Sequence, residues 1–298
     1  MIEQDKETLD ELLRYHAGVI GSARMTVLGL TSLIGAFREL KAYPDEIAEV
    51  FGEVLAAVRA SRPKLIALID LLSEFEVELR PYLECEDMEE ARGHVIRLLE
   101  EKIEIYKAKV AAVTEHGLEH IENGDTILVH SASSVIINIL TEATRRLNKI
   151  FRVMVLQLDP VRTPQAAKTL DYEGIPHLIV PMADLCHYQD QVDKLFIGAL
   201  TVTPDRKMVA PKGTASVLAI CHLAGIKSYS FANTLHYSRG VASTQQIHLT
   251  ETDMVEADTQ YQLISHSHDL VDLGLIDVIV NEYGVTSFVG QRAQGEEG

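Results

Sequence analysis

The chain has 298 residues, of which 47% are hydrophobic and 24% charged, and its formal net charge at pH 7 is -17. This length fits one large or two ordinary domains, and the composition is that of a globular protein with a full core. Nucleic acids and anionic membranes are themselves negatively charged, so they repel such a surface. We therefore expect no nucleic-acid partner and no membrane partner.

The cysteines and the N-terminal region indicate a cytoplasmic protein. Cys85, Cys186 and Cys221 are odd in number and far apart, which favours reduced thiols over a disulfide framework or a structural zinc site. The first residues, "MIEQDKETLDELL", are acidic and amphipathic, unlike a signal peptide. Residues 17–37 approach the length of a membrane span, but Arg24 lies inside them, so we expect a buried helix instead.

The first 120 residues are patterned as helices throughout. Apolar residues recur at helical spacing, and Pro44 and Pro63 stand where helices commonly begin. No alternation typical of a strand is present in this half of the sequence. The expected helices cover residues 5–16, 45–60, 62–79 and 87–121. The sequence therefore predicts a helical N-terminal domain over residues 1–121.

The pattern changes at "ENGDT", residues 122–126, after which short apolar runs alternate with helical segments. This order predicts a doubly wound, mostly parallel, Rossmann-like α/β domain over residues 122–298. The expected strands are 126–130, 152–158, 177–181, 194–200, 228–232 and 277–282, and the expected helices between them are 133–147, 164–173 and 214–224. A polar loop is expected between residue 200 and Lys212.

Ligands of such sheets bind at the carboxyl ends of the strands. That rule selects the segments 130–131, 159–160, 181–184, 200–214 and 233–234. The candidate ligand and phosphate-binding residues come from these segments or lie close to them: His130, Ser131, Ser133, Ser134, Arg162, Lys212, Gly213 and Thr214.

Each of these candidates has a structural alternative. One of the serines can cap the helix that follows them, with or without an anion at its free N–H groups. Arg162 can bind a phosphate with two donors or lie in a surface turn. Gly213 permits close backbone approach, Thr214 offers a hydroxyl and Lys212 adds charge, but the spacing is not that of a P-loop.

Two histidine patterns resemble metal sites. The segment "ISHSHDL", residues 264–270, has H-x-H-x-D spacing, but we find no other cluster that pairs with it and expect a surface segment. His116 and His120 are four residues apart on one helix, without a third ligand, and we expect a solvent-facing pair. We expect no metal and no cofactor.

Six motifs in order resemble the translation-initiation-factor-2B-like proteins over nearly the whole chain. They are "IGSARM" (20–25), "SRPKLIALIDLL" (61–72), "GDTILVHSASSVIINIL" (124–140), "EGIPHLIVPMAD" (173–184), "VDKLFIGALTVTPDRKMVAPKGTASVLAICHLAGIKSYSF" (192–231) and "DLVDLGLIDVIVNEYGVTS" (269–287). This family includes the α, β and δ regulatory subunits of that factor, methylthioribose-1-phosphate isomerase and ribose-1,5-bisphosphate isomerase. The resemblance implies a homodimer formed through the α/β domain.

The departures from the isomerase pattern bear on catalysis. Ser131 stands where the isomerases have a cysteine, and Leu200 stands where they have an aspartate. Their Asn-Lys before the Gly-Thr step is Ala210-Pro211 here. Moving a proton between adjacent carbons needs an acid or base close by, and a leucine side chain cannot supply one. The resemblance therefore implies a divergent member that lacks the catalytic pair.

Three functions remain open from the sequence. The preferred one is a non-catalytic, regulatory protein that binds a phosphorylated sugar or a nucleotide monophosphate. The second is an aldose-ketose isomerase of a ribose-1-phosphate derivative with relocated catalytic groups, for which Asp184 and Cys186 are weak candidates beside His130, Asp205 and Glu282. The third is a subunit that acts through a protein partner alone.

Overall fold

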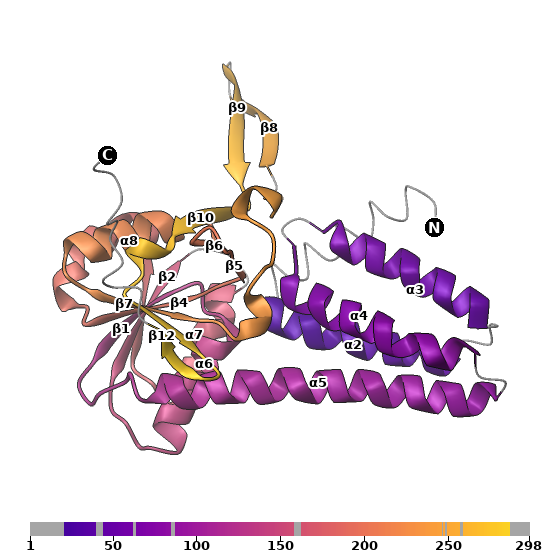
Figure 1. Cartoon of the computed structure of the whole chain (residues 1–298). Coiled ribbons are helices and arrows are strands. Elements are labelled where there is room, and N and C mark those ends of the chain that lie inside the picture. Colours follow the sequence, from indigo (N-terminus) through magenta and orange to yellow (C-terminus); the bar gives the residue numbers. More distant parts are fainter. Residues whose placement is uncertain are drawn as a thin grey trace, which may run out of the picture. The chain divides into compact units, whose positions relative to one another are not determined.

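The computed structural model describes residues 21–39, 44–61, 64–84, 87–157, 162–245, 247, 249–256 and 259–286. The chain divides into two compact units, Met1–Ala112 and Val113–Gly298, and both are drawn in Figure 1. This division falls inside helix α5 (Met88–Leu118). The domain boundary after residue 121 stays a prediction. The helix expected over 5–16, the segment 159–160 and Cys85 lie outside the described residues.

The first unit is built from helices, as predicted. They are α2 (Ser22–Glu39), α3 (Pro44–Arg59), α4 (Ile66–Leu79), the short η1 (Arg80–Glu84) and most of α5. Phe75 of α4 is fully buried and makes edge contacts with Phe37 of α2 and Phe51 of α3, at centroid distances of 6.2 and 5.1 Å. These contacts join the three helices in one core.

Helix α2 covers most of the stretch whose length approaches a membrane span. It buries Leu30, Ile34 and Phe37 on one side, while Arg24 is exposed. Within the described part of the chain, no helix combines the length and the apolar character that a membrane crossing requires.

The second unit contains a seven-stranded sheet that is parallel except at one edge. Its strands are β1 (Thr126–His130), β2 (Arg152–Gln157), β3 (His177–Pro181), β4 (Lys194–Gly198), β7 (Lys227–Phe231), β11 (Val278–Asn281) and β12 (Gly284–Thr286). Their spatial order is β12-β11-β7-β4-β1-β2-β3, and only β12 pairs antiparallel. The chain winds outward from β1 in one direction and from β4 in the other, which confirms the doubly wound prediction.

Helices α6 (Ser134–Arg145), α7 (Arg162–Tyr172) and α8 (Thr214–Leu223) pack on this sheet. Ile139 of α6 and Leu170 of α7 share a buried cluster with Ile127 of β1, whereas Val217 of α8 belongs to a second cluster with Leu128 of the same strand. Successive residues of a strand point to opposite faces. Both faces of the sheet are therefore covered, as the continuous apolar runs of its strands predict.

The prediction of a polar loop between residues 200 and 212 is wrong. The chain instead forms β5 (Thr201–Val202) and β6 (Lys207–Pro211), which join β10 (His268–Asp272) in a three-stranded antiparallel sheet. Its central strand buries Met208, Val209 and Ala210. Residues 203–206 do form a turn, and their polar character hid the strands on either side.

The prediction that residues 264–270 form a surface segment is only partly correct. A two-stranded sheet of β8 (Leu249–Glu256) and β9 (Thr259–His266) ends there with exposed side chains, including Leu263 at 51% exposure. Beyond it, however, β10 packs on β6 and half-buries His268 and Asp269. Short 3-10 turns complete the unit at Met182–His187 (η2), Gln189–Gln191 (η3), Thr234–His236 (η4), Ala242–Thr244 (η5) and Leu273–Leu275 (η6).

Candidate functional site

The sheet reverses its winding between β1 and β4, at the point where open α/β sheets bind their ligands. His130 ends β1, and Gly198 ends β4 beside it. A Cβ added to Gly198 would lie 3.1 Å from Oγ of Ser133, so the end of β4 packs closely against the start of α6. Ser133 caps that helix by accepting a hydrogen bond from the backbone N–H of Ile136 at 3.3 Å. Ser134 is the first residue of the helix.

Ser131 follows β1 in a strained conformation. Its φ is +56°, in the left-handed region that side chains other than glycine seldom adopt, and its side chain is buried. Such strain costs about 1–3 kcal/mol and is concentrated at functional sites. Arg162, at the start of α7, donates from Nη1 to Oγ of Ser131 across 3.4 Å. Two of the predicted residues, 31 positions apart, therefore lie together at the switch point.

His130 is fully buried beside the turn before α8. Both of its ring nitrogens are buried without a hydrogen-bond partner among the described residues. Burial lowers the pKa of His130 to about 4; the backbone of Pro211 and Lys212 lies close enough to oppose this shift but makes no hydrogen bond of normal geometry with the ring. The imidazole is therefore neutral at pH 7.

Gly213 occupies a position that only glycine fits well. Its φ is +88°, and an added Cβ would meet Sδ of Met182 at 2.6 Å and Cε1 of His130 at 3.6 Å. The residue thus brings the start of α8 against the end of β1. Sequence reasoning predicted both sides of this contact, His130 and Gly213, but not that they touch.

The N-terminus of α8 already has an anionic partner. Oδ2 of Asp269, on β10, accepts a hydrogen bond from the backbone N–H of Ala215 at 3.0 Å. The hydroxyl of Thr214 donates to the backbone oxygen of Pro211, and Nζ of Lys212 donates to Oγ of Ser265 at 2.6 Å. The groups predicted to hold a phosphate here are engaged with the chain itself.

Sequence reasoning missed Asp269 as a part of this site. Two signals were available: the "HSHDL" pattern, whose spacing resembles a metal site rather than a helix cap, and the family motif of residues 269–287, which begins at Asp269. His268, on the same strand, has a buried Nδ1 with no partner among the described residues. Burial lowers the pKa of His268 to about 4, and the nearby positive charge of Arg162 acts in the same direction. Strand β10 therefore contributes two side chains to the region between α7 and α8.

The candidates for relocated catalysis are dispersed. Asp184 and Cys186 are exposed on η2. Asp205 accepts hydrogen bonds from the backbone N–H of Ala242, and its pKa is lowered, first by a hydrogen bond from Thr203. Glu282 accepts hydrogen bonds from the backbone and hydroxyl of Thr234. Of these groups, only His130 is described in contact with the switch-point residues.

The histidine pair at the end of α5 differs from expectation, because His116 lies in the last turn of the helix and His120 in the turn after it. His120 is not solvent-facing: its ring lies tilted against that of Tyr229 at a centroid distance of 4.8 Å, and burial lowers its pKa. Among the described residues, no three His, Cys, Asp or Glu side chains are grouped to hold a metal ion. Cys221 is fully buried, and burial raises the pKa of its thiol to about 12, so it is no nucleophile at neutral pH.

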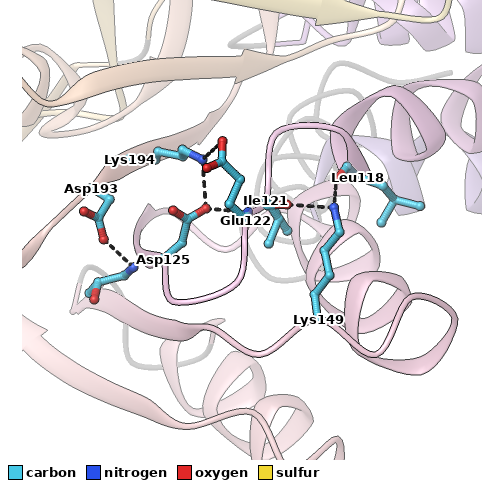
Figure 2. A network of polar contacts seen from close by, with 8 residues as sticks. Leu118, Ile121, Glu122, Asp125, Lys149, Asp193 and Lys194 are labelled. Atoms are coloured by element: carbon cyan, nitrogen blue, oxygen red, sulfur yellow. Dashed lines mark hydrogen bonds and ion pairs between the residues drawn. The ribbon is translucent and has the colours of Figure 1, made fainter.

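The opposite, amino-terminal end of the sheet is densely hydrogen-bonded, as Figure 2 shows. Nζ of Lys194 donates to Oδ2 of Asp125 at 2.8 Å and to Oε1 of Glu122 at 3.3 Å. Asp193 accepts the backbone N–H of Thr126 at 2.7 Å. In the same view, Lys149 donates to the backbone oxygens of Leu118 and Ile121, both at 2.7 Å, where α5 ends. The charges drawn at this end are paired, although Nε2 of the nearby His120 is buried without a partner among the described residues.

These features define an α/β protein with a helical N-terminal unit and a polar site at the switch point of its sheet. The "Initiation factor 2 subunit family" matches residues 18–287, and the chain belongs to that family. It is 21% identical over 292 residues to the translation initiation factor eIF2B subunit delta of Dictyostelium discoideum, which covers 90% of this chain and 47% of that protein. It is 24% identical over 209 residues to the ribose 1,5-bisphosphate isomerase of Thermococcus kodakarensis, which covers 67% of this chain and 65% of the isomerase.

Solved structures share the fold. The translation initiation factor eIF-2B of Pyrococcus horikoshii OT3 covers 97% of this chain and 98% of its own, with a TM-score of 0.80 and 19% identity. The 5-methylthioribose 1-phosphate isomerase of the same organism covers 95% of this chain and 84% of its own, with a TM-score of 0.73 and 14% identity. A chain of the tetrameric eIF2B-beta2-delta2 complex of C. thermophilum matches with a TM-score of 0.73 and 17% identity over 95% of this chain and 92% of its own.

Proposed function

We propose that this protein is a non-catalytic, regulatory member of its family that binds a phosphorylated sugar or a nucleotide monophosphate at the switch point. The observation that carries the proposal is the pairing of Ser131 and Arg162. A strained, buried hydroxyl and a guanidinium meet where the sheet reverses its winding. Arginine is suited to phosphate because its planar fork donates two parallel hydrogen bonds.

The proposal of a non-catalytic role rests on the two positions that depart from the isomerase pattern. Ser131 is a far poorer acid than the cysteine it replaces, and the Leu200 side chain cannot transfer a proton. The Leu200 backbone is held in place, because its N–H donates to Val209 and its oxygen contacts Nδ1 of His236 at 2.9 Å. Neither interaction restores an acid at that position.

The relatives support a regulatory role and an isomerase role alike, because their names include both eIF2B subunits and sugar-phosphate isomerases. The chain spans between about half and two thirds of the length of the relatives it matches, from 47% to 66%. The site residues, rather than the relatives, therefore favour the regulatory role over the isomerase role. A cytoplasmic location and a homodimer through the α/β unit, with or without a further protein partner, complete the proposal. Equilibrium sedimentation tests the dimer.

Isothermal titration calorimetry with ribose 5-phosphate and AMP tests the binding function. We expect at least one of them to bind, and Arg162→Gln to weaken it by about 10- to 100-fold, because a charge-assisted hydrogen bond contributes roughly 1.5–3 kcal/mol. Arg146→Gln is the matched control. It removes the same charge from an exposed ion pair at the far end of α6, with Glu115 and Glu142. A protein that binds neither compound at millimolar concentration would refute the binding function.

A measurement of turnover distinguishes the isomerase alternative from ligand binding without catalysis. Solvent deuterium exchange into bound ribose 1-phosphate derivatives, followed by NMR, detects proton transfer between adjacent carbons. We expect no exchange in the wild-type protein. Exchange that is lost in Asp184→Ala or Cys186→Ser would establish the isomerase with relocated groups and overturn the non-catalytic role.

A further inference from the structure

The turn that leads into β1, residues 122–125, contains a pair of residues with a reactivity of its own. Asn123 is followed by Gly124, and none of the other asparagines of the chain precedes a glycine. Both residues are exposed, and φ of Gly124 is +94°, in the left-handed region. A glycine has no side chain that shields its backbone nitrogen. Outside a fixed structure, that nitrogen can therefore reach the side-chain amide of the preceding asparagine.

The reaction open to this pair is deamidation. The backbone nitrogen of Gly124 loses its proton to a base in the solvent and attacks Cγ of Asn123. The new C–N bond closes an imide ring, the bond from Cγ to the side-chain nitrogen breaks, and ammonia leaves with the proton. Water then opens the imide at either carbonyl group and gives aspartate or isoaspartate. The reaction needs no oxidant, no reductant and no reactant other than water.

The fold holds both reacting groups against one residue, Ile150, in the segment between α6 and β2. The N–H of Gly124 donates to the backbone oxygen of Ile150 at 2.7 Å, and Oδ1 of Asn123 accepts the N–H of Ile150 at 2.8 Å. The second bond by itself polarises the amide and favours attack. The first bond opposes the reaction, because an N–H that faces a carbonyl oxygen resists losing its proton. Attack therefore requires the turn to separate from Ile150.

The turn is kept in place by the network of Figure 2, which lies on both sides of the Asn-Gly pair. Oδ2 of Asp125 accepts the backbone N–H of Glu122 at 2.6 Å, and the backbone oxygen of Asp125 accepts the N–H of Arg152 at 2.8 Å. Lys194 forms ion pairs with both carboxylates. Opening of the turn is therefore coupled to the stability of the amino-terminal end of the sheet.

We propose that Asn123 is a deamidation site that records opening of this end of the sheet. Chains with the turn in place keep the asparagine, and chains that open convert it irreversibly. Isoaspartate adds a methylene group to the backbone just before Gly124, so Gly124 and Asp125 cannot both keep their hydrogen bonds to residues 150–152. Either product also adds a carboxylate beside the two that Lys194 neutralises. A converted chain is therefore less stable at this end. The inference is independent of ligand binding at the carboxyl end.

Peptide mass spectrometry measures the conversion after incubation of the full chain at pH 8, with and without guanidinium chloride. We expect Asn123 to convert at least about tenfold more slowly in the folded protein, because slow chemistry follows the population of the open turn. Asn148, an exposed asparagine followed by Lys149, is the internal control and should convert slowly under both conditions. Equal rates for Asn123 in the folded and unfolded protein would overturn the proposal, and so would its absence of conversion in guanidinium chloride.

Lys194→Met tests whether the network controls the reaction. It removes the cation between Asp125 and Glu122, so conversion in the folded protein should become at least about threefold faster, with no change in guanidinium chloride. Lys207→Met is the matched control, because it breaks an exposed ion pair of the same 2.8 Å length, and it should change neither rate. Equal acceleration by both variants would refute control by the network. The wild-type comparison decides the proposal even where Lys194→Met fails to fold.

The consequence for stability is measured on the converted chain. Protein aged in guanidinium chloride is refolded, and anion-exchange chromatography separates the converted form by its additional negative charge. We expect the converted form to unfold at a lower urea concentration than unconverted protein from the same preparation. Equal midpoints would show that the turn tolerates the product, which would overturn the proposed loss of stability.

Discussion

The polar and charged groups at the two ends of the parallel sheet are partnered to different extents. At the amino-terminal end, Lys194 neutralises Asp125 and Glu122, and Asp193 accepts the first N–H of β1 (Figure 2). At the carboxyl-terminal end, His130 and His268 have buried ring nitrogens without partners among the described residues, and Ser131 is strained. Both ends lie on the same strands, so strand composition alone does not produce the difference.

The difference between the two ends indicates where a ligand binds. Buried polar groups are almost always hydrogen-bonded, so those left unpartnered mark positions that a ligand or water completes. The amino-terminal end has fewer such groups: the charges of Lys194, Asp125 and Glu122 are paired, and Nε2 of His120 is a buried nitrogen without a partner among the described residues there. The carboxyl-terminal end retains donors, acceptors and backbone strain at a cost in stability. Stability and binding are thus assigned to opposite ends of one sheet.

The largest expected effect of a single substitution is at the amino-terminal end. Burial would lower the pKa of Lys194, but hydrogen bonds and charge from Asp125 and Glu122 outweigh it and raise the pKa. The side chains of Lys194 and Asp125 are 13% and 10% exposed. Lys194→Met leaves Asp125 without this partner, so we expect the free energy of unfolding to fall by about 3 kcal/mol. Urea denaturation measures it.

The control for this substitution is Lys207→Met. Lys207 also forms a 2.8 Å ion pair, with Asp272, but the two side chains are 38% and 54% exposed. Exposed pairs contribute about 0–1 kcal/mol. Equal losses in the two variants would show that the amino-terminal network is no more important than a surface pair, and the contrast between the two ends would disappear.

A somewhat smaller effect for each residue is expected from acid. The pKa values of His130 and His268 are lowered from 6.5 to about 4, chiefly by burial. Between these values the unfolded chain binds more protons than the folded one, so stability is lost as pH falls from 6.5 towards 4. At pH 5 the loss is about 2 kcal/mol for each histidine.

Urea denaturation at pH 7.5 and pH 5 compares the wild-type protein with His130→Gln and His268→Gln. Each variant should lose less stability on acidification than the wild-type protein does. His222, near the end of α8, supplies the control His222→Gln. An acid sensitivity that stays the same in His130→Gln would mean that His130 is protonated or solvated in the folded state.

The smallest expected effect comes from replacing either of two glycines at opposite ends of the sheet. Gly213 (φ +88°) and Gly225 (φ +72°) are both in the left-handed region, but only Gly213 has neighbours within 4 Å of an added Cβ. Gly225→Ala should lower the free energy of unfolding by about 1 kcal/mol from backbone strain alone. Gly213→Ala should lower it by about 1–2 kcal/mol and also weaken ligand binding, because Met182 must move. Binding that is unaffected in Gly213→Ala would place the ligand elsewhere.

Local sequence predicted the regular elements well and the irregular ones poorly. The six parallel strands were found because each is a short run rich in apolar residues, and five of them are mostly buried, while the edge strand β3 is partly exposed. Strands β5 and β6 were missed because the turn between them, residues 203–206, is polar. The hairpin of β8 and β9 was missed because most of its side chains face solvent and its alternation is weak.

The candidate site was predicted as separate pieces. His130, Ser131 and Gly213 were chosen because each follows a strand or precedes a helix, a rule that needs only the order of elements. Asp269 was not chosen, because its partner, Ala215, is 54 residues away. The sequence signals that mark caps extend only a few residues from the helix.

The helical first unit, the doubly wound sheet and the end of the sheet at which polar residues gather follow from periodicity and element order, which are local properties of the sequence. The family follows from the resemblance of six motifs in order. Which polar groups have partners depends instead on the tertiary structure. The pairing of β10 with β6 brings Asp269 to α8 and leaves His130 buried beside Gly213 without a partner among the described residues. Such contacts depend on long-range strand pairing, which leaves no local signature in the chain.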